Sequence, residues 1–291
     1  MRGNAEAHEL IAPGSLTAVL ETLASAPGEW TPIAGGTELM VAHAAGKLPP
    51  SKLISLWGIP DLRFIETSPQ SIAIGAGTTF RELRSGTVAS EFPLLAEAAS
   101  WIGSIANQTR ATIGGNLVNG SPAADSSPAL LVYDAEIELA SVRGRRRLPY
   151  SEFHTGYKRN VLTPDELLYA IHLPRRFAQH RRYIRKVGTR RAMAISKVAL
   201  AATALLRDGV ITEIRLAAAS LAPFPSRLNQ TEAFLLGASV NGDTIQGARQ
   251  TLLAEARPID DIRSTADYRR HVGANLLEEF LLLIRSEGST R

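Results

Sequence analysis

The sequence contains no cysteine among its 291 residues. This absence excludes disulfide bridges, cysteine nucleophiles and zinc sites built from thiolates. It also excludes any iron–sulfur cluster that this chain would hold with its own thiols. This chain therefore cannot carry out redox or metal chemistry that depends on its own cysteines.

Long apolar runs are also absent. The longest apolar stretch runs from Val198 to Leu206, far short of the roughly 20 residues that a membrane span needs. The first residues lack the apolar segment of a signal peptide, so we expect a cytoplasmic chain without a membrane span. The formal net charge is only +4, and 45% hydrophobic and 21% charged residues are ordinary for a globular protein.

Length and pattern predict two domains, over residues 1–177 and 178–291, and the first of these divides into subdomains of about 1–55 and 56–177. In the first subdomain, Ser15 precedes apolar residues at helical spacing and predicts a capped helix. The other elements expected there are an extended segment over 30–33, a helix over 38–45 and a strand over 52–56.

The second subdomain has a mixed pattern. Thr79 and Glu82 form a capping box that predicts a short helix. We expect strands over 62–67, 71–75, 136–142 and 167–173, helices over 93–99 and 125–133, and a loop over 101–116.

Arginines between Arg175 and Arg191 mark the expected start of the second domain. Beyond them, Asp208-Gly209 between two apolar runs predicts a β-hairpin, and three helices are expected near 231–236, 244–253 and 268–284. No interleaved aromatic residues or nucleic-acid-binding module accompany these arginines or those at 143–147. A solvated loop or a docking surface for an acidic partner is the expected role.

Two glycine-rich segments are the most informative features. They are Ala34-Gly35-Gly36-Thr37-Glu38-Leu39 and Thr112-Ile113-Gly114-Gly115-Asn116-Leu117. Consecutive glycines allow backbone N–H groups to surround an anion, and one segment on each side would suit a pyrophosphate. Two ordinary tight turns are the alternative, because Gly-Gly-polar sequences are common. Neither segment is a Walker A or a Rossmann sequence.

Two further groups have open roles. Asp125 lies at the start of an expected helix, where a carboxylate usually caps the helix, although it can also accept a hydrogen bond from a sugar hydroxyl. The six histidines show no spacing typical of metal ligands. No nucleophile, acid or base is therefore expected from spacing alone.

Together, five blocks in register resemble the FAD-binding medium subunit of the molybdenum hydroxylases, the xanthine dehydrogenase and carbon monoxide dehydrogenase family. The blocks are residues 34–39, residues 112–125 with Ser121-Pro122-Ala123-Ala124-Asp125, residues 153–159, residues 162–166 and residues 186–196. The resemblance implies an α+β fold, with a vanillyl-alcohol-oxidase (PCMH)-type FAD-binding domain of two α/β subdomains. A smaller α+β domain of antiparallel strands and helices follows it.

The resemblance also implies roles for individual residues. The backbone of Gly35, Gly36, Thr37, Gly114, Gly115 and Asn116 would hold the FAD pyrophosphate, with Ala34, Glu38 and Leu39 beside the cofactor. Thr112 and Asp125 would contact the ribityl–phosphate portion, and Tyr157 and Arg159 the isoalloxazine end. The absence of cysteine excludes covalent attachment of flavin to that residue, and the resemblance implies noncovalent FAD. No residue of this chain would be catalytic, because the flavin supplies the redox chemistry.

As such a subunit, the chain would transfer electrons within a larger enzyme. A large partner subunit would hold the molybdenum cofactor, and a small one would hold two [2Fe–2S] clusters, in a dimer of heterotrimers. Electrons would leave FAD to NAD⁺ or another acceptor. Two alternatives are a stand-alone FAD oxidoreductase of the same fold and a non-enzymatic module that binds anions or nucleic acid.

Overall fold

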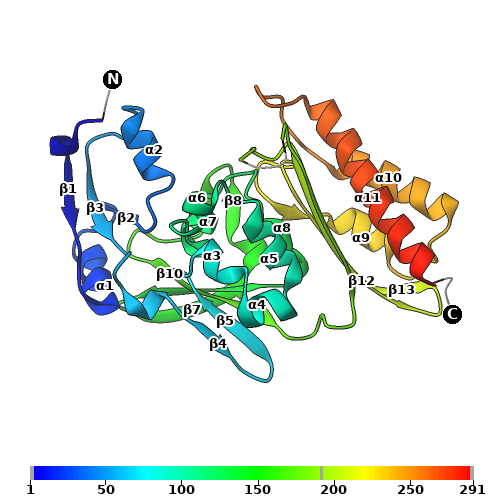
Figure 1. The fold of residues 1–291 in the computed structure, drawn as a ribbon, viewed down its shortest axis with the longest axis horizontal. Helices are drawn as coiled ribbons and strands as arrows, with labels where there is room; N and C mark the ends of the chain where they lie inside the picture. The colour runs from blue at the N-terminus through cyan, green and yellow to red at the C-terminus, as the bar shows by residue number, and fades with distance from the viewer. Residues whose placement is uncertain (1–2, 191–192, 289–291) are drawn as a thin grey trace.

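The computed structural model describes residues 3–190 and 193–288. An N-terminal α/β unit and a C-terminal sheet with its helices lie at opposite ends of the long axis, with a helix-rich central part between them (Figure 1). Helices and strands are mixed throughout, as expected for an α+β protein. No helix within the described ranges is long and apolar enough to cross a membrane.

The N-terminal unit is a small parallel sheet with one buried helix. The strands follow the order β1-β3-β2, with bounds His8–Ile11, Ser51–Ser55 and Trp30–Ile33. The predicted helix is confirmed as α1 (Leu16–Ser25), capped by the Ser15 hydroxyl, which accepts a hydrogen bond from the Ala18 N–H at 3.2 Å. The second helix, α2 (Leu39–Ala44), has no buried residue.

The central part is a five-stranded antiparallel sheet covered by short helices. Its strand order is β4-β5-β10-β6-β7, with bounds Ile65–Thr67, Ser71–Gly75, Leu167–Pro174, Glu136–Ser141 and Gly144–Pro149. The covering helices are α3 (Phe80–Leu83), α4 (Gly86–Glu91), α5 (Pro93–Ser100) and α8 (Ser126–Val132). The capping box of Thr79 and Glu82 is confirmed at the start of α3. The strand expected over 62–67 is shorter than predicted, because a 3₁₀ turn occupies Pro60–Leu62.

The loop expected over 101–116 is wrong. It contains the helix α6 (Ile105–Gln108), and a second helix, α7 (Ile113–Asn119), begins within it. Ser104 and Asn107 form a capping box, and the Thr112 hydroxyl accepts the Gly115 N–H at 3.2 Å. Glycine disfavours a helix interior, and the packing of Gly114 against Ala76 outweighs that preference.

The solvated loop expected for the arginines at 143–147 is right only in part: all four are exposed, but only Arg143 lies in a turn. Residues 144–149 form the edge strand β7, and its arginines pair with carboxylates of neighbouring segments. Arg146 donates to Glu166 at 2.7 Å, and Arg147 lies 2.9 Å from Glu138. These guanidinium groups therefore stabilise the edge of the sheet.

The C-terminal part is a four-stranded antiparallel sheet, β11-β12-β13-β14, with three helices on one face. Its strands are Arg181–Val187, Val198–Arg207, Val210–Ala219 and Ser226–Arg227, and its helices are α9 (Asn229–Leu235), α10 (Gly242–Glu255) and α11 (Ala266–Gly288). The predicted hairpin is confirmed: Asp208 and Gly209 both have positive φ, 51° and 77°.

Both faces of this sheet are buried. Leu200 and Ala202 pack with α10 and α11, whereas Ala201 belongs to the core of the central part. The Thr203 hydroxyl, also on that second face, donates to the Val132 carbonyl of α8 at 3.4 Å. The sheet therefore lies between the helices of two hydrophobic cores.

Candidate FAD site

A large cavity lies between the N-terminal unit and the central part. It has a volume of about 650 Å³, within the range of small-molecule sites. Both glycine-rich segments line it, through Ala34, Gly35, Gly36, Thr37, Glu38, Leu39, Thr112, Gly114, Gly115 and Asn116. The structure thus brings together two segments that are far apart in the sequence.

Gly35 makes this close approach possible. A Cβ atom on Gly35 would lie 1.7 Å from the carbonyl oxygen of Arg110, just before the second segment. The Arg110 guanidinium donates in return to the Gly35 carbonyl at 3.4 Å and stacks on the Trp57 ring, 3.7 Å from its centroid. Only glycine fits where the two backbones meet.

The first segment offers free backbone donors. Within the described residues, the N–H groups of residues 35–38 have no hydrogen-bond acceptor. Gly36 has φ +77°, a conformation that favours glycine and that turns consecutive N–H groups toward one side. This segment can therefore bind an anion through neutral donors.

The second segment is different, because its backbone donors are already paired. The N–H groups of Ile113 and Gly114 donate to the carbonyls of Thr78 and Ala76 at 3.0 and 2.9 Å. The next two donate to the Thr112 hydroxyl and carbonyl. What remains for a ligand is the Thr112 O–H and the side-chain amide of Asn116.

A hydrogen bond fixes that amide. The Ser126 hydroxyl donates to Asn116 Oδ1 at 2.7 Å, which leaves the Nδ2 group as a donor beside the cavity. The second segment therefore contributes side-chain donors and close packing, while the first contributes backbone donors.

Negative charge at the cavity wall is neutralised by cations. Glu166 accepts two hydrogen bonds from Arg146, at 2.7 and 2.8 Å, and one from the Thr163 N–H at 2.9 Å. The Arg146 contact, opposed by burial and supported by Thr163, lowers the pKa of Glu166 to about 2. Glu38, at the other wall, lies 3.4 Å from Lys158 Nζ. An anionic ligand therefore meets carboxylates that already have partners.

Tyr157 and Arg159 do not line the cavity. They flank the turn between β8 (His154–Gly156) and β9 (Arg159–Asn160), and both are exposed, Tyr157 at 61%. Lys158 between them has φ +51° and reaches Glu38. The hairpin thus borders the cavity through Asn160.

Asp125 also lies outside the cavity lining. It occupies the N-cap position of α8, but its side chain caps no N–H group, so the capping interpretation is wrong. The carboxylate accepts instead from Lys186 Nζ at 2.6 Å and from the Ser196 hydroxyl. Burial raises the pKa of Asp125, against the opposing effect of these two partners. The pair joins α8 to β11 across the two cores.

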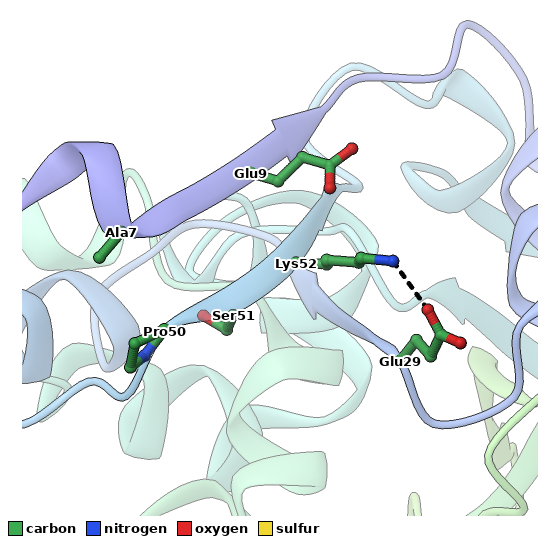
Figure 2. Close-up of a pocket in the computed structure, with 6 residues that line it drawn as sticks. All are labelled: Ala7, Glu9, Glu29, Pro50, Ser51 and Lys52. Atoms are coloured by element: carbon green, nitrogen blue, oxygen red, sulfur yellow. Dashed lines mark hydrogen bonds and ion pairs between the residues drawn. The ribbon is translucent and has the colours of Figure 1, made fainter.

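A second hollow, of about 370 Å³, lies over β1 and β3 (Figure 2). Its main polar contact is the ion pair of Lys52 and Glu29 at 2.8 Å. Exposed ion pairs of this kind contribute little energy, and the hollow contains no group that points to a ligand.

Comparison with known families agrees with this geometry. A family model described as "FAD binding domain in molybdopterin dehydrogenase" matches residues 6–176, and one described as "CO dehydrogenase flavoprotein C-terminal domain" matches residues 183–284. The chain belongs to this FAD-binding family.

Individual relatives match nearly the whole chain. The xanthine dehydrogenase FAD-binding subunit of Escherichia coli O157:H7 is 32% identical over 243 residues, 82% of this chain and 83% of the relative. The carbon monoxide dehydrogenase medium chain of Hydrogenophaga pseudoflava is 27% identical over 274 residues, 94% of this chain and 95% of the relative. A solved structure of carbon monoxide dehydrogenase from that organism superposes with a TM-score of 0.90 at 27% identity, covering 99% of this chain and 98% of that chain.

The FAD-binding domain has wall residues that the sequence did not reveal as part of a site. Trp30 and Pro32 of β2 line the cavity, as do Leu162 and Pro164 after the hairpin. Lys186 was also missed as the partner of Asp125, because 61 residues separate the two. The segments 162–166 and 186–196 are predicted to matter only from the family resemblance, and not from their composition or spacing.

Proposed function

We propose that this chain is the electron-transfer subunit of a cytoplasmic molybdenum hydroxylase. A small partner subunit with two [2Fe–2S] clusters would deliver electrons, and a large partner subunit would hold the molybdenum cofactor and hydroxylate the substrate. The acceptor would be NAD⁺ or another oxidant. The observation that carries this proposal is the cavity with unpaired backbone donors in a domain of the FAD-binding family.

The residues around the cavity fit FAD. The free N–H groups of Gly35, Gly36 and Thr37 would donate to the pyrophosphate, where charge strengthens each hydrogen bond. Thr112 and Asn116 would donate from the opposite side, where Gly114 and Gly115 also line the cavity. Ala34, Glu38 and Leu39 would lie along it.

The flavin end of the site would lie toward the hairpin and toward α8. Tyr157 and Arg159 would approach the ring, with Arg159 as a fixed positive charge near it. Asp125, held by Lys186, would accept from a ribityl hydroxyl. When bound, FAD supplies the redox chemistry, and this chain binds it, orients it and sets the electrostatic field around it.

Several relatives support a role within an assembly. Their names describe a "medium chain" of carbon monoxide dehydrogenase and an "FAD-subunit" of nicotinate dehydrogenase from Eubacterium barkeri. A chain without cysteine has no thiolates for clusters of its own. A dimer of heterotrimers would combine the three subunits.

The test is an absorption spectrum of the purified chain, with acid release and identification of the cofactor. Released FAD supports the site, and capture of molybdenum-containing and iron–sulfur subunits on a tagged chain supports the assembly. A chain that stays colourless when it is co-expressed with these subunits and supplied with FAD would overturn the proposal.

A further inference from the structure

Few side-chain contacts hold the helix that follows the first glycine segment. None of the residues of α2 is buried, and Met40 and Val41 are 49% and 66% exposed. The unpaired N–H groups of residues 35–38 lie directly before this helix. Their positions therefore depend on contacts that fix the helix from outside.

Histidine provides such a contact at the end of α2. His43 Nδ1 lies 3.2 Å from His8 Nε2 on β1, and the two rings meet edge to face with centroids 5.1 Å apart. The other ring nitrogen of His8 lies 3.1 Å from the Ser51 hydroxyl of β3. A continuous chain of side chains thus joins α2 to two strands.

The backbone of Gly3 closes the other side of this contact. A Cβ atom on Gly3 would lie 2.2 Å from the His43 carbonyl oxygen and 2.7 Å from its ring. His43 is therefore enclosed between Gly3 and His8 and has little freedom to turn away.

The other long-range polar contacts of the first glycine segment do not hold the C-terminal end of α2. In the part of the chain that the structure describes, they are the Arg110 contact with Gly35 and the exposed pair of Lys158 and Glu38. The first fixes the start of the segment, and the second contributes little because it is exposed. The end of α2 thus depends on His43.

We infer that the His8–His43 pair positions the FAD-binding segment, an inference that rests on the proposed function. Neither histidine lines the cavity, so both act through the backbone of residues 35–38 and not by contact with the cofactor. Loss of the pair lets α2 move and withdraws the backbone donors from the pyrophosphate.

The experiment measures FAD affinity of the full chain by flavin fluorescence at pH 7.5. His43→Ala should weaken binding about three- to tenfold, the range for one lost hydrogen bond. His8→Ala should do the same, and the double variant should be no weaker than either single one. His43→Asn, which keeps a polar amide near the Nδ1 position, should bind within about twofold of wild type.

Two controls separate positioning from general effects. His271→Ala removes an exposed imidazole from α11 and should leave affinity unchanged. Trypsin cleavage after the exposed Lys47, measured without FAD, should be faster in His43→Ala than in wild type, and the unfolding temperature shows whether each variant is folded.

The outcomes are distinguishable. Wild-type affinity in His43→Ala together with unchanged cleavage at Lys47 would overturn the inference. If wild type binds no FAD, the proposed function fails, while the cleavage assay still decides whether the pair holds α2.

Discussion

Substitution of Gly35 by alanine tests the junction of the two glycine-rich segments. The new Cβ atom would lie 1.7 Å from the Arg110 carbonyl oxygen, 2.5 Å from its carbonyl carbon and 3.1 Å from the Ala111 nitrogen. All three are backbone atoms, so no flexible side chain can turn aside. The segments must separate by more than 1 Å, because real Cβ contacts are not shorter than 3.0 Å.

The loss of FAD-binding free energy follows from the N–H donors that this separation displaces. A hydrogen bond to a charged group contributes about 1.5–3 kcal/mol, so loss of two donors from the pyrophosphate costs about 3–6 kcal/mol. FAD affinity should therefore fall by a factor of about 10² to 10⁴. Overpacking itself should cost only about 1–3 kcal/mol of folding stability.

The assay is a titration of the folded apo-chain with FAD, followed by flavin fluorescence, beside a thermal unfolding curve. Gly58→Ala is the matched control, because a Cβ atom there meets nothing within 4 Å. Binding by Gly35→Ala within about threefold of wild type would refute the reasoning, because the donors would then not depend on this close approach.

Three further changes probe other parts of the molecule. Lys186→Met leaves the Asp125 carboxylate buried without its cation and should lower the free energy of unfolding in denaturant by about 3–5 kcal/mol at pH 7. This loss should shrink at lower pH, because burial raises the pKa of Asp125 and the carboxyl can be protonated. Equal stability of the variant and wild type at pH 7 would contradict this account. Glu166→Gln should flatten the dependence of folding stability on acid pH, because the Arg146 contact lowers the pKa of Glu166 to about 2. The stabilisation by this carboxylate is present above pH 4.5 and is lost as the pH falls toward 2. Identical curves of stability against pH for wild type and variant in this interval would exclude the effect. Arg159→Ala should lower the reduction potential of bound FAD in a spectroelectrochemical titration, and an unchanged potential would place this cation away from the ring.

Local chemistry explains which elements the sequence predicts well. The Asp208-Gly209 turn requires positive φ at both residues, and the Thr79–Glu82 capping box satisfies N–H groups within one turn of helix. Both features are complete within a few residues. They form as predicted because no distant partner has to be known.

Features that depend on distant partners could not be predicted in this way. Gly114 is helical because Ala76 packs against it, and the arginines of β7 are ordered because Glu138 and Glu166 lie opposite them. Helix propensity and charge alone favour a loop in both cases. Tertiary contacts decide the outcome.

For the candidate site, sequence motifs located the two segments but not how each would bind. Spacing suggested that both backbones hold the anion, whereas only the first has unpaired N–H groups within the described residues. The difference arises from Ala76 and Thr78, which accept from the start of α7. The FAD contacts of the individual residues stay predictions.

The C-terminal sheet contributes side chains to two hydrophobic cores and therefore couples the folding of both halves of the molecule. Ala201 and Ala202 are neighbours on β12, yet they stabilise different halves of the molecule. A chain shortened to residue 177 would leave α8 without the sheet that covers it. Because each half thus buries apolar surface of the other, neither half is expected to unfold alone. One cooperative transition should span both halves, and exchange of either half between relatives should succeed only when both faces of β12 and β13 are exchanged with it.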